Sequence, residues 1–152
     1  MTALMVVKDG EVVFNVPDKS PAAIRAQIRA WTKSLLSLPP GEQREFEVQH
    51  TLIDGVYTRT LFIPKDSVLV GKIHLKECVN IVAKGDISVL TETGMGRFKA
   101  GHVAVSGPGI QKVGYAHEDT VFINVFRTEL TDIDKIEAEI ATTEYAEDLI
   151  CQ

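Results

Sequence analysis

The sequence predicts a mainly β protein, a single small barrel or jelly roll with helical segments before and after it. Short runs of β-forming residues separated by turn residues fill the stretch 46–126, and many short strands at near-even spacing are typical of these architectures. The length of 152 residues, with 45% hydrophobic and 24% charged residues, suits one globular domain with its own core. We therefore divide the chain into a hairpin and helix at 1–45, a barrel at 46–128, and an acidic helix and tail at 129–152.

The first part of the chain predicts a β-hairpin followed by a helix. β-Forming residues flank Asp9 and Gly10, a pair that favours a tight hairpin turn. Ser20 is suited to cap a helix, and Pro21 suits its first position. Prolines and a glycine at 39–41 end the helix, because proline cannot continue its hydrogen bonds. A regularly spaced apolar stripe indicates the buried face of this helix: Ile24, Ile28, Trp31 and Leu35.

The middle of the chain predicts a series of strands. Apolar and polar residues alternate over 46–52, Asp54 and Gly55 supply a hairpin turn, and 56–63 is the returning strand. Further strands are predicted at 68–74, 79–83, 87–90, 102–105 and 121–126, with glycine-containing turns between them.

The last part of the chain predicts an acidic helix. Thr131 or Asp132 can cap its start, and apolar positions follow at Ile133, Ile136, Ile140 and Leu149. From Glu129 onward there are eight acidic residues against one lysine, a charge of −7, so the rest of the chain sums to +2 of the total of −5. This distribution argues against general nucleic-acid binding, but it allows a local anion pocket in the body of the protein.

The sequence also indicates where the protein is found. The apolar start at 3–7 is cut off by Lys8 and Asp9, too short for a signal peptide or a membrane span. Cys78 and Cys151 lie far apart and form no disulfide framework, so we expect two free thiols in a cytoplasmic protein.

A segment framed by Gly71 and Gly85 resembles the first motif of the cupin superfamily, the RmlC-like jelly rolls. That motif has a glycine, two histidines separated by one residue, a carboxylate and a closing glycine. Here the first histidine position falls on Lys72, the second on His74, and the carboxylate position on Cys78. Glu77 lies one place early. The resemblance implies a cupin-type β-barrel, and it implies a dimer, since cupins frequently dimerise.

The second cupin motif resembles residues 107–112. Gly107 replaces its usual proline, Gly109 matches its glycine, and Lys112 stands at the metal-binding histidine. One of the four usual ligand positions, His74, is therefore kept, and we expect no metal cofactor.

A narrower resemblance covers the strings 79–87, 114–120 and 131–137, which are similar to small cupin-like proteins encoded by tailed bacteriophages. It implies a viral protein acting in the cytoplasm of an infected bacterium. A structural virion or assembly protein is an alternative.

Three kinds of site compete for these residues. Lys72, His74 and Lys112, with Arg59 as a fourth member, would form a cationic pocket for a small anion, such as a metabolite or a signalling nucleotide. The plainer interpretation is that the lysines extend into solvent. A shifted divalent metal site would use His74 and Glu77, with either His50 or His117 as a further ligand.

The third kind of site is metal-free catalysis, as in sugar epimerases with a cupin fold. His74 or His117 as base, Asp119 to orient it and Tyr115 as acid are the residue types required. The string 115–119 equally predicts a polar turn between strands, which we favour. Cys78 is predicted to be a small buried core residue.

The sequence therefore favours a non-enzymatic cupin-type protein that binds a small anionic ligand, or a partner protein, through its barrel. The alternative is a cupin enzyme, metal-dependent or epimerase-like, that acts on a sugar or a small acid.

Overall fold

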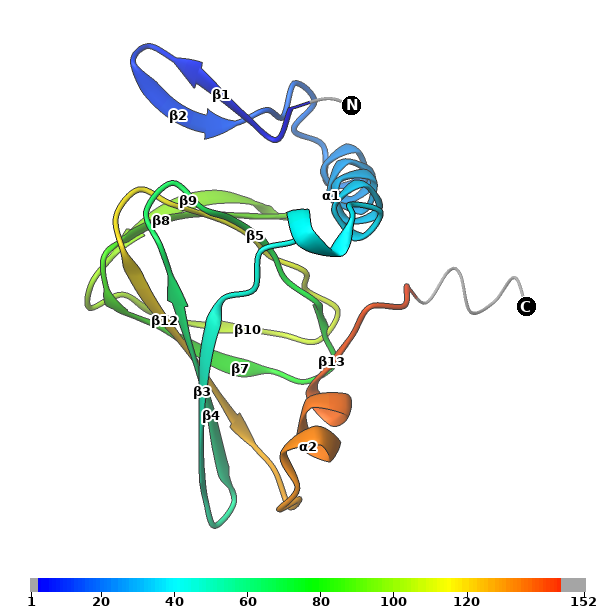
Figure 1. Cartoon of the computed structure of the whole chain (residues 1–152), viewed down its shortest axis with the longest axis vertical. Coiled ribbons are helices and arrows are strands. Elements are labelled where there is room, and N and C mark those ends of the chain that lie inside the picture. Colours follow the sequence, from blue (N-terminus) through cyan, green and yellow to red (C-terminus); the bar gives the residue numbers. More distant parts are fainter. Residues whose placement is uncertain (1–2, 146–152) are drawn as a thin grey trace.

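Two antiparallel sheets that face each other form the centre of the protein (Figure 1), in a computed structural model that describes residues 3–145. The larger sheet has the order β10-β7-β12-β4-β3, and the smaller sheet has the order β5-β11-β8-β9. The larger sheet consists of β3 (Glu47–Ile53), β4 (Val56–Ile63), β7 (Cys78–Lys84), β10 (Val103–Ser106) and β12 (Thr120–Arg127). The smaller sheet consists of β5 (Val68–Val70), β8 (Asp86–Thr91), β9 (Gly94–Lys99) and β11 (Val113–Ala116).

This architecture confirms the predicted mainly β, cupin-type jelly roll. In the described residues, no strand pairing closes the two sheets into one barrel, so the fold is a two-sheet sandwich. β12 lies at the centre of the larger sheet, paired along its whole length with β4 and over most of its length with β7. Side chains alternate between the two faces of each strand, so Phe122 and Phe126 point inward from β12 into the space between the sheets.

The N-terminal hairpin and helix form as predicted. β1 (Met5–Lys8) and β2 (Glu11–Phe14) are joined through Asp9 and Gly10, both with positive φ. α1 (Pro21–Leu36) begins after Ser20, whose hydroxyl accepts a hydrogen bond from the amide of Ala23.

The apolar stripe of α1 covers the smaller sheet. Ile24, Ile28 and Trp31 are buried in one cluster with Leu90, Val113 and Tyr115 of that sheet, whereas Leu35 is half-buried. A short 3-10 helix η1 (Pro40–Glu42) follows, where the prolines were expected to end α1.

The structure corrects several predicted elements. The predicted strand 68–74 is two strands, β5 and β6 (Ile73–His74), and β6 leaves the smaller sheet to pair with β13 (Ala141–Thr142). β9 and β11 were not predicted. The C-terminal helix α2 (Ile133–Ile140) is shorter than predicted, because the backbone at Ala141 becomes extended and joins β6. Leu149 and Cys151 lie outside the described residues.

α2 packs beside one end of the space between the sheets. Asp132 caps it by accepting a hydrogen bond from the amide of Lys135 at 3.0 Å. Ile136 and Ile140 are buried in a cluster with Tyr57, Cys78 and Phe126 of the larger sheet. In the described part of the chain, no helix is long and apolar enough to cross a membrane.

Candidate functional site

A cavity of about 230 Å³ lies between the two sheets, and it contains the polar residues that the sequence singled out. Its wall is mostly apolar, with side chains such as Leu61, Ile87 and Phe122 from both sheets. The polar and charged groups that line it are Arg59 of β4, Lys72 and His74 beside and in β6, Lys112, Asn124 of β12 and Glu137 of α2. The structure therefore brings all four predicted ligand-binding residues to one cavity, and it adds Glu137 and Asn124.

Lys112 is a half-buried charge in this cavity. Its Nζ donates a hydrogen bond to the Ser106 hydroxyl at 3.0 Å. Within residues 3–145, no carboxylate lies within ion-pair distance of it. Burial lowers the pKa of Lys112, because the ammonium form loses solvation there.

The Ser106 hydroxyl belongs to a chain of hydrogen bonds across the larger sheet. The side-chain amide nitrogen of Asn80 donates to the Ser106 hydroxyl at 3.0 Å, and the side-chain amide nitrogen of Asn124 donates to the side-chain oxygen of Asn80 at 2.7 Å. Asn80 and Asn124 are buried, so these bonds satisfy groups that would otherwise be costly to desolvate. These hydrogen bonds fix Ser106 beside Lys112 and so hold the ammonium group at the cavity wall.

His74 is an uncharged group in the same cavity at neutral pH. Its pKa is lowered to about 4, first by burial and then by the positive charges of Lys112 and Arg59. Its ring meets Phe126 edge-on with 5.6 Å between centroids, and its Nδ1 lies 3.6 Å from the Cys78 sulfur. Cys78 is buried, as predicted for a core residue.

Arg59 differs from Lys112 because it has an acidic neighbour. Its Nε lies 3.6 Å from a Glu137 oxygen, and His50 Nδ1 lies 3.8 Å from the same oxygen. Tyr57 lies 2.6 Å from His50 through its hydroxyl, and burial and the charge of Glu137 raise the pKa of Tyr57 to about 12. α2 therefore brings a counter-charge to the Arg59 side of the cavity, which the sequence did not predict.

The residues present do not fit a divalent metal. Glu77 is exposed and does not line the cavity, so the pair His74 and Glu77 is not assembled. Lys72 and Lys112 offer donors where a metal needs lone pairs. Among the described side chains, no group of three or more His, Cys, Asp or Glu residues has the arrangement of a metal site.

The epimerase-like set is assembled only in part: the rings of Tyr115 and His117 meet edge-on with 5.0 Å between centroids, whereas Asp119 has a different partner. Tyr115 belongs to β11, where its hydroxyl donates to Asp66 at 2.9 Å, while Asp119 accepts a hydrogen bond from the amide of Lys65. His117 Nε2 lies 2.7 Å from the Ser88 hydroxyl. His74 is in the cavity and contacts none of these three. The predicted polar turn is thus correct for 117–119 and wrong for Tyr115 and Ala116, which are in a strand.

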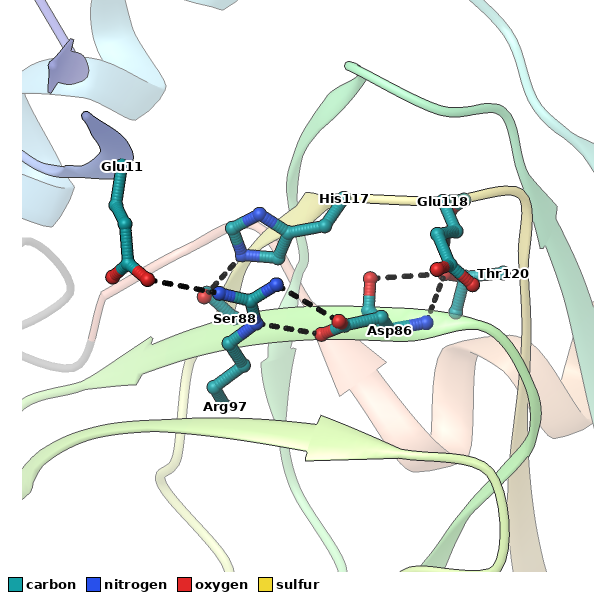
Figure 2. Close-up of polar contacts among 7 residues, drawn as sticks. All are labelled: Glu11, Asp86, Ser88, Arg97, His117, Glu118 and Thr120. Carbon is teal, nitrogen blue, oxygen red and sulfur yellow. Dashed lines mark hydrogen bonds and ion pairs between the residues drawn. The ribbon is translucent and has the colours of Figure 1, made fainter.

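His117 belongs to a polar network at the edge of the smaller sheet (Figure 2). The buried carboxylate of Asp86 accepts two hydrogen bonds from Arg97, at 2.8 and 2.9 Å. The other side of the same guanidinium lies 4.0 Å from Glu11 of the N-terminal hairpin. These contacts connect the hairpin, β8, β9 and the turn after β11, which indicates a structural role.

Comparison with known proteins supports the fold and no more. The sequence matches no protein-family model and no curated protein. Among solved structures, the DMSP lyase DddQ from Ruegeria pomeroyi is similar with a TM-score of 0.53 and 13% identity, over 63% of this chain and 53% of that one. An RmlC-like cupin from Shewanella frigidimarina has a TM-score of 0.49 and 18% identity, over 65% and 95% of the two chains. An RmlC-like cupin with a double-stranded β-helix from Methanocaldococcus jannaschii has a TM-score of 0.48 and 11% identity, over 60% and 88%.

Proposed function

We propose that the protein binds a small organic anion, a carboxylate with an apolar body, in the cavity between its sheets. One observation carries this proposal: the Lys112 ammonium lies at a mostly apolar cavity wall with a neutral hydroxyl as its partner. A bound carboxylate would give this charge a counter-ion, and charge-assisted hydrogen bonds are strongest where water is excluded. Lys72 adds positive charge at the same cavity, whereas Glu137 offsets the charge of Arg59.

The neutral His74 supports a ligand with both donors and acceptors near its carboxylate. An imidazole with a pKa of about 4 is uncharged at neutral pH, so it offers one donor and one acceptor. The apolar wall would contact the rest of the ligand and supply affinity by burial.

The size of the cavity favours a small metabolite over a nucleotide. Its volume of about 230 Å³ is below the roughly 300 Å³ at which pockets for drug-sized ligands begin. We therefore expect a short-chain acid, and not a signalling nucleotide.

Native mass spectrometry of the freshly purified protein, followed by a thermal-shift titration, tests the proposal. The titration series consists of short carboxylic acids of increasing apolar length, with inorganic phosphate and adenosine monophosphate for comparison. We expect at least one acid to raise the melting temperature, since a ligand at about 100 times its Kd adds about 2.7 kcal/mol of stability.

Two variants make the test specific. Lys112→Met keeps the length of the side chain and removes its charge, so it should abolish the shift. Lys33→Met changes an exposed lysine of α1 and should leave the shift intact. Binding that is equally strong in Lys112→Met, or the absence of binding across the series together with no co-purified anion, would contradict the proposal.

The other predicted functions remain predictions. They are binding of a partner protein, a phage-encoded accessory role in an infected cell, a virion component, and an enzyme acting on a sugar or small acid. For the epimerase-like version, the rings of Tyr115 and His117 are in contact, but Asp119 binds the amide of Lys65 and the Tyr115 hydroxyl donates to Asp66, so the predicted orienting role of Asp119 has no support.

A further inference from the structure

Two lysines form one charged end of the cavity. Lys112 is held beside Ser106 of β10, with 3.0 Å between its Nζ and the hydroxyl oxygen. The amide of Gly71 donates a hydrogen bond to the carbonyl oxygen of Lys112 at 2.9 Å, so the next residue, Lys72, starts beside Lys112. Both lysines line the cavity. We call this the lysine end of the cavity, and the proposed carboxylate would bind here.

Arg59 lies at a different end of the cavity. It belongs to β4, and the order of the larger sheet places β12 and β7 between β4 and β10. Three strand spacings of about 4.8 Å put the backbones of β4 and β10 roughly 14 Å apart. Asn124, which is paired with Arg59 in the strand register, and His74 line the same cavity without a charge at neutral pH. A ligand bound at the lysine end therefore extends its other end toward Arg59.

Glu137 brings a negative charge to the Arg59 end. It lines the cavity, and one of its oxygens lies 3.6 Å from Arg59 Nε and 3.8 Å from His50 Nδ1. The side chains of Arg59 and Glu137 are 33% and 35% exposed, so water shields their charges only in part. Burial, and after it the charge of Glu137, raise the pKa of Tyr57 to about 12. The carboxylate therefore acts on groups inside the protein as well as on Arg59.

The packing of α2 fixes the backbone at Glu137. Ile136 and Ile140 of this helix are buried in a cluster with side chains of the larger sheet. Glu139 accepts a hydrogen bond from the Thr128 hydroxyl at 2.8 Å. Because α2 is held by buried residues and by this hydrogen bond, its backbone cannot retreat from the cavity when a ligand enters. Glu137 is thus a permanent part of the Arg59 end.

We propose that Glu137 makes the cavity selective for monocarboxylates and excludes dicarboxylates, an inference that rests on the proposed binding of short acids. The first carboxylate pairs with the lysine end. A second carboxylate at the other end of the ligand would meet Glu137 beside an Arg59 whose charge is already offset, and like charges repel strongly where water is partly excluded. It would also lose its hydration without gaining a counter-ion.

A methyl group at the same place meets no such penalty. Phe126 and Ile140 line the cavity and belong to one apolar cluster beside α2. An uncharged end of the ligand can contact these side chains and gain free energy by leaving water. The Arg59 end of the cavity therefore favours an apolar end of the ligand over a charged one.

Pairs of acids with equal chain length test this selectivity. Isothermal titration calorimetry of the full chain at about pH 7.5, where free carboxyl groups are ionised, compares butanoate, pentanoate and hexanoate with the dicarboxylates of the same carbon number. The wild type should bind the best monocarboxylate at least tenfold more tightly than its dicarboxylate partner. Glu137→Gln keeps the size of the side chain and removes its charge. This variant should shift the ratio tenfold or more toward the dicarboxylate, because the charge of Arg59 is then no longer offset.

Two further variants make the result specific. Asp134→Asn is the matched control, since it removes one carboxylate from an exposed position of the same helix that does not line the cavity. It should leave the ratio unchanged. The double variant Glu137→Gln with Arg59→Met should lose the gain for the dicarboxylate, because its second carboxylate then has no cation at that end. Circular dichroism verifies that all variants are folded.

The failure of this inference differs from the failure of the proposed function. If no acid binds the wild type or Glu137→Gln, the proposed function is wrong and the selectivity falls with it. If monocarboxylates bind and the ratio is the same in the wild type, Glu137→Gln and Asp134→Asn, only the role of Glu137 is overturned. A gain for the dicarboxylate that persists without Arg59 overturns the role of the Arg59 pair.

Discussion

His74 couples the protonation of one side chain to the stability of the fold. Its pKa of about 4 in the folded protein is below its ordinary value of 6.5, so the unfolded chain binds more protons between these two values. Stability is therefore complete above pH 6.5 and is lost as the pH falls toward 4. The shift corresponds to about 3 kcal/mol, which partial exposure of the ring reduces to about 2 kcal/mol.

Urea denaturation at several pH values between 4 and 7 measures this effect. Because an asparagine has no proton to gain in this range, His74→Asn should flatten the dependence of the unfolding free energy on pH by about 2 kcal/mol. His102→Asn, at a histidine outside the cavity, should preserve the slope. If the unfolding free energy of His74→Asn depended on pH as steeply as that of the wild type, protonation of the His74 ring would carry no cost in stability.

For Lys112, we expect the charge that serves ligand binding to lower the stability of the protein without ligand. Its ammonium is desolvated with one hydroxyl as partner, so Lys112→Met removes an unfavourable charge and keeps the apolar contacts. Ser106 still accepts the hydrogen bond from Asn80. We expect Lys112→Met to raise the unfolding free energy by about 0.5–1 kcal/mol in the absence of ligand, measured by urea denaturation. A loss of 1 kcal/mol or more would mean that the lysine stabilises the fold.

At the scale of elements, the turn between β7 and β8 depends on Gly85. Its φ is +97°, and a Cβ there would lie 2.5 Å from the carbonyl oxygen of Asp119 and 2.7 Å from the Cα of Thr120. Backbone atoms cannot move aside, so we expect Gly85→Ala to cost about 2–4 kcal/mol of unfolding free energy. Gly41→Ala is the control, because its Cβ would meet nothing within 4 Å. Equal melting temperatures for the two variants would contradict this account.

The ion pair between Arg97 of β9 and Asp86 of β8 adds to the backbone pairing of these two strands. Asp86 is 4% exposed, so Arg97→Met would leave a buried carboxylate without its two strongest hydrogen bonds. We expect a loss of about 2–3 kcal/mol in chemical denaturation. Arg127→Met removes an ion pair to Glu129 in which both side chains are more than 80% exposed, and it should change stability by less than about 0.5 kcal/mol. Similar losses in both variants would refute the role of burial.

Local sequence signals predicted the elements that depend on local chemistry. The hairpin turn at Asp9 and Gly10 and the cap at Ser20 were identifiable because each follows from a few adjacent residues. β9 was missed because Gly94 and Gly96 lower its intrinsic preference for strand, so its conformation comes from pairing with β8. β11 was missed for a similar reason: it contains Gly114 and is held between β5 and β8.

At the scale of the whole molecule, the positions of Lys72, His74 and Lys112 around one cavity followed from the motif frame of the sequence, and Arg59, outside both motifs, joins them there. Their binding role stays a prediction. The proximity of Glu137 to Arg59 was not predictable, because the approach of α2 depends on the packing of Ile136 and Ile140 against the larger sheet. The hydrogen-bond chain beneath Lys112 was missed because its members come from three strands far apart in sequence.

The central position of β12 has a consequence for how the protein is made. β3 pairs with β4, and β7 pairs with β10, but β12 alone joins these two pairs into one sheet. While a ribosome is still synthesising the chain before Thr120, both pairs present an unsatisfied strand edge. Such edges readily capture other chains. The nascent protein is therefore most exposed to aggregation until Arg127 has emerged, and cells that lower the rate of translation initiation should yield more of it in native form.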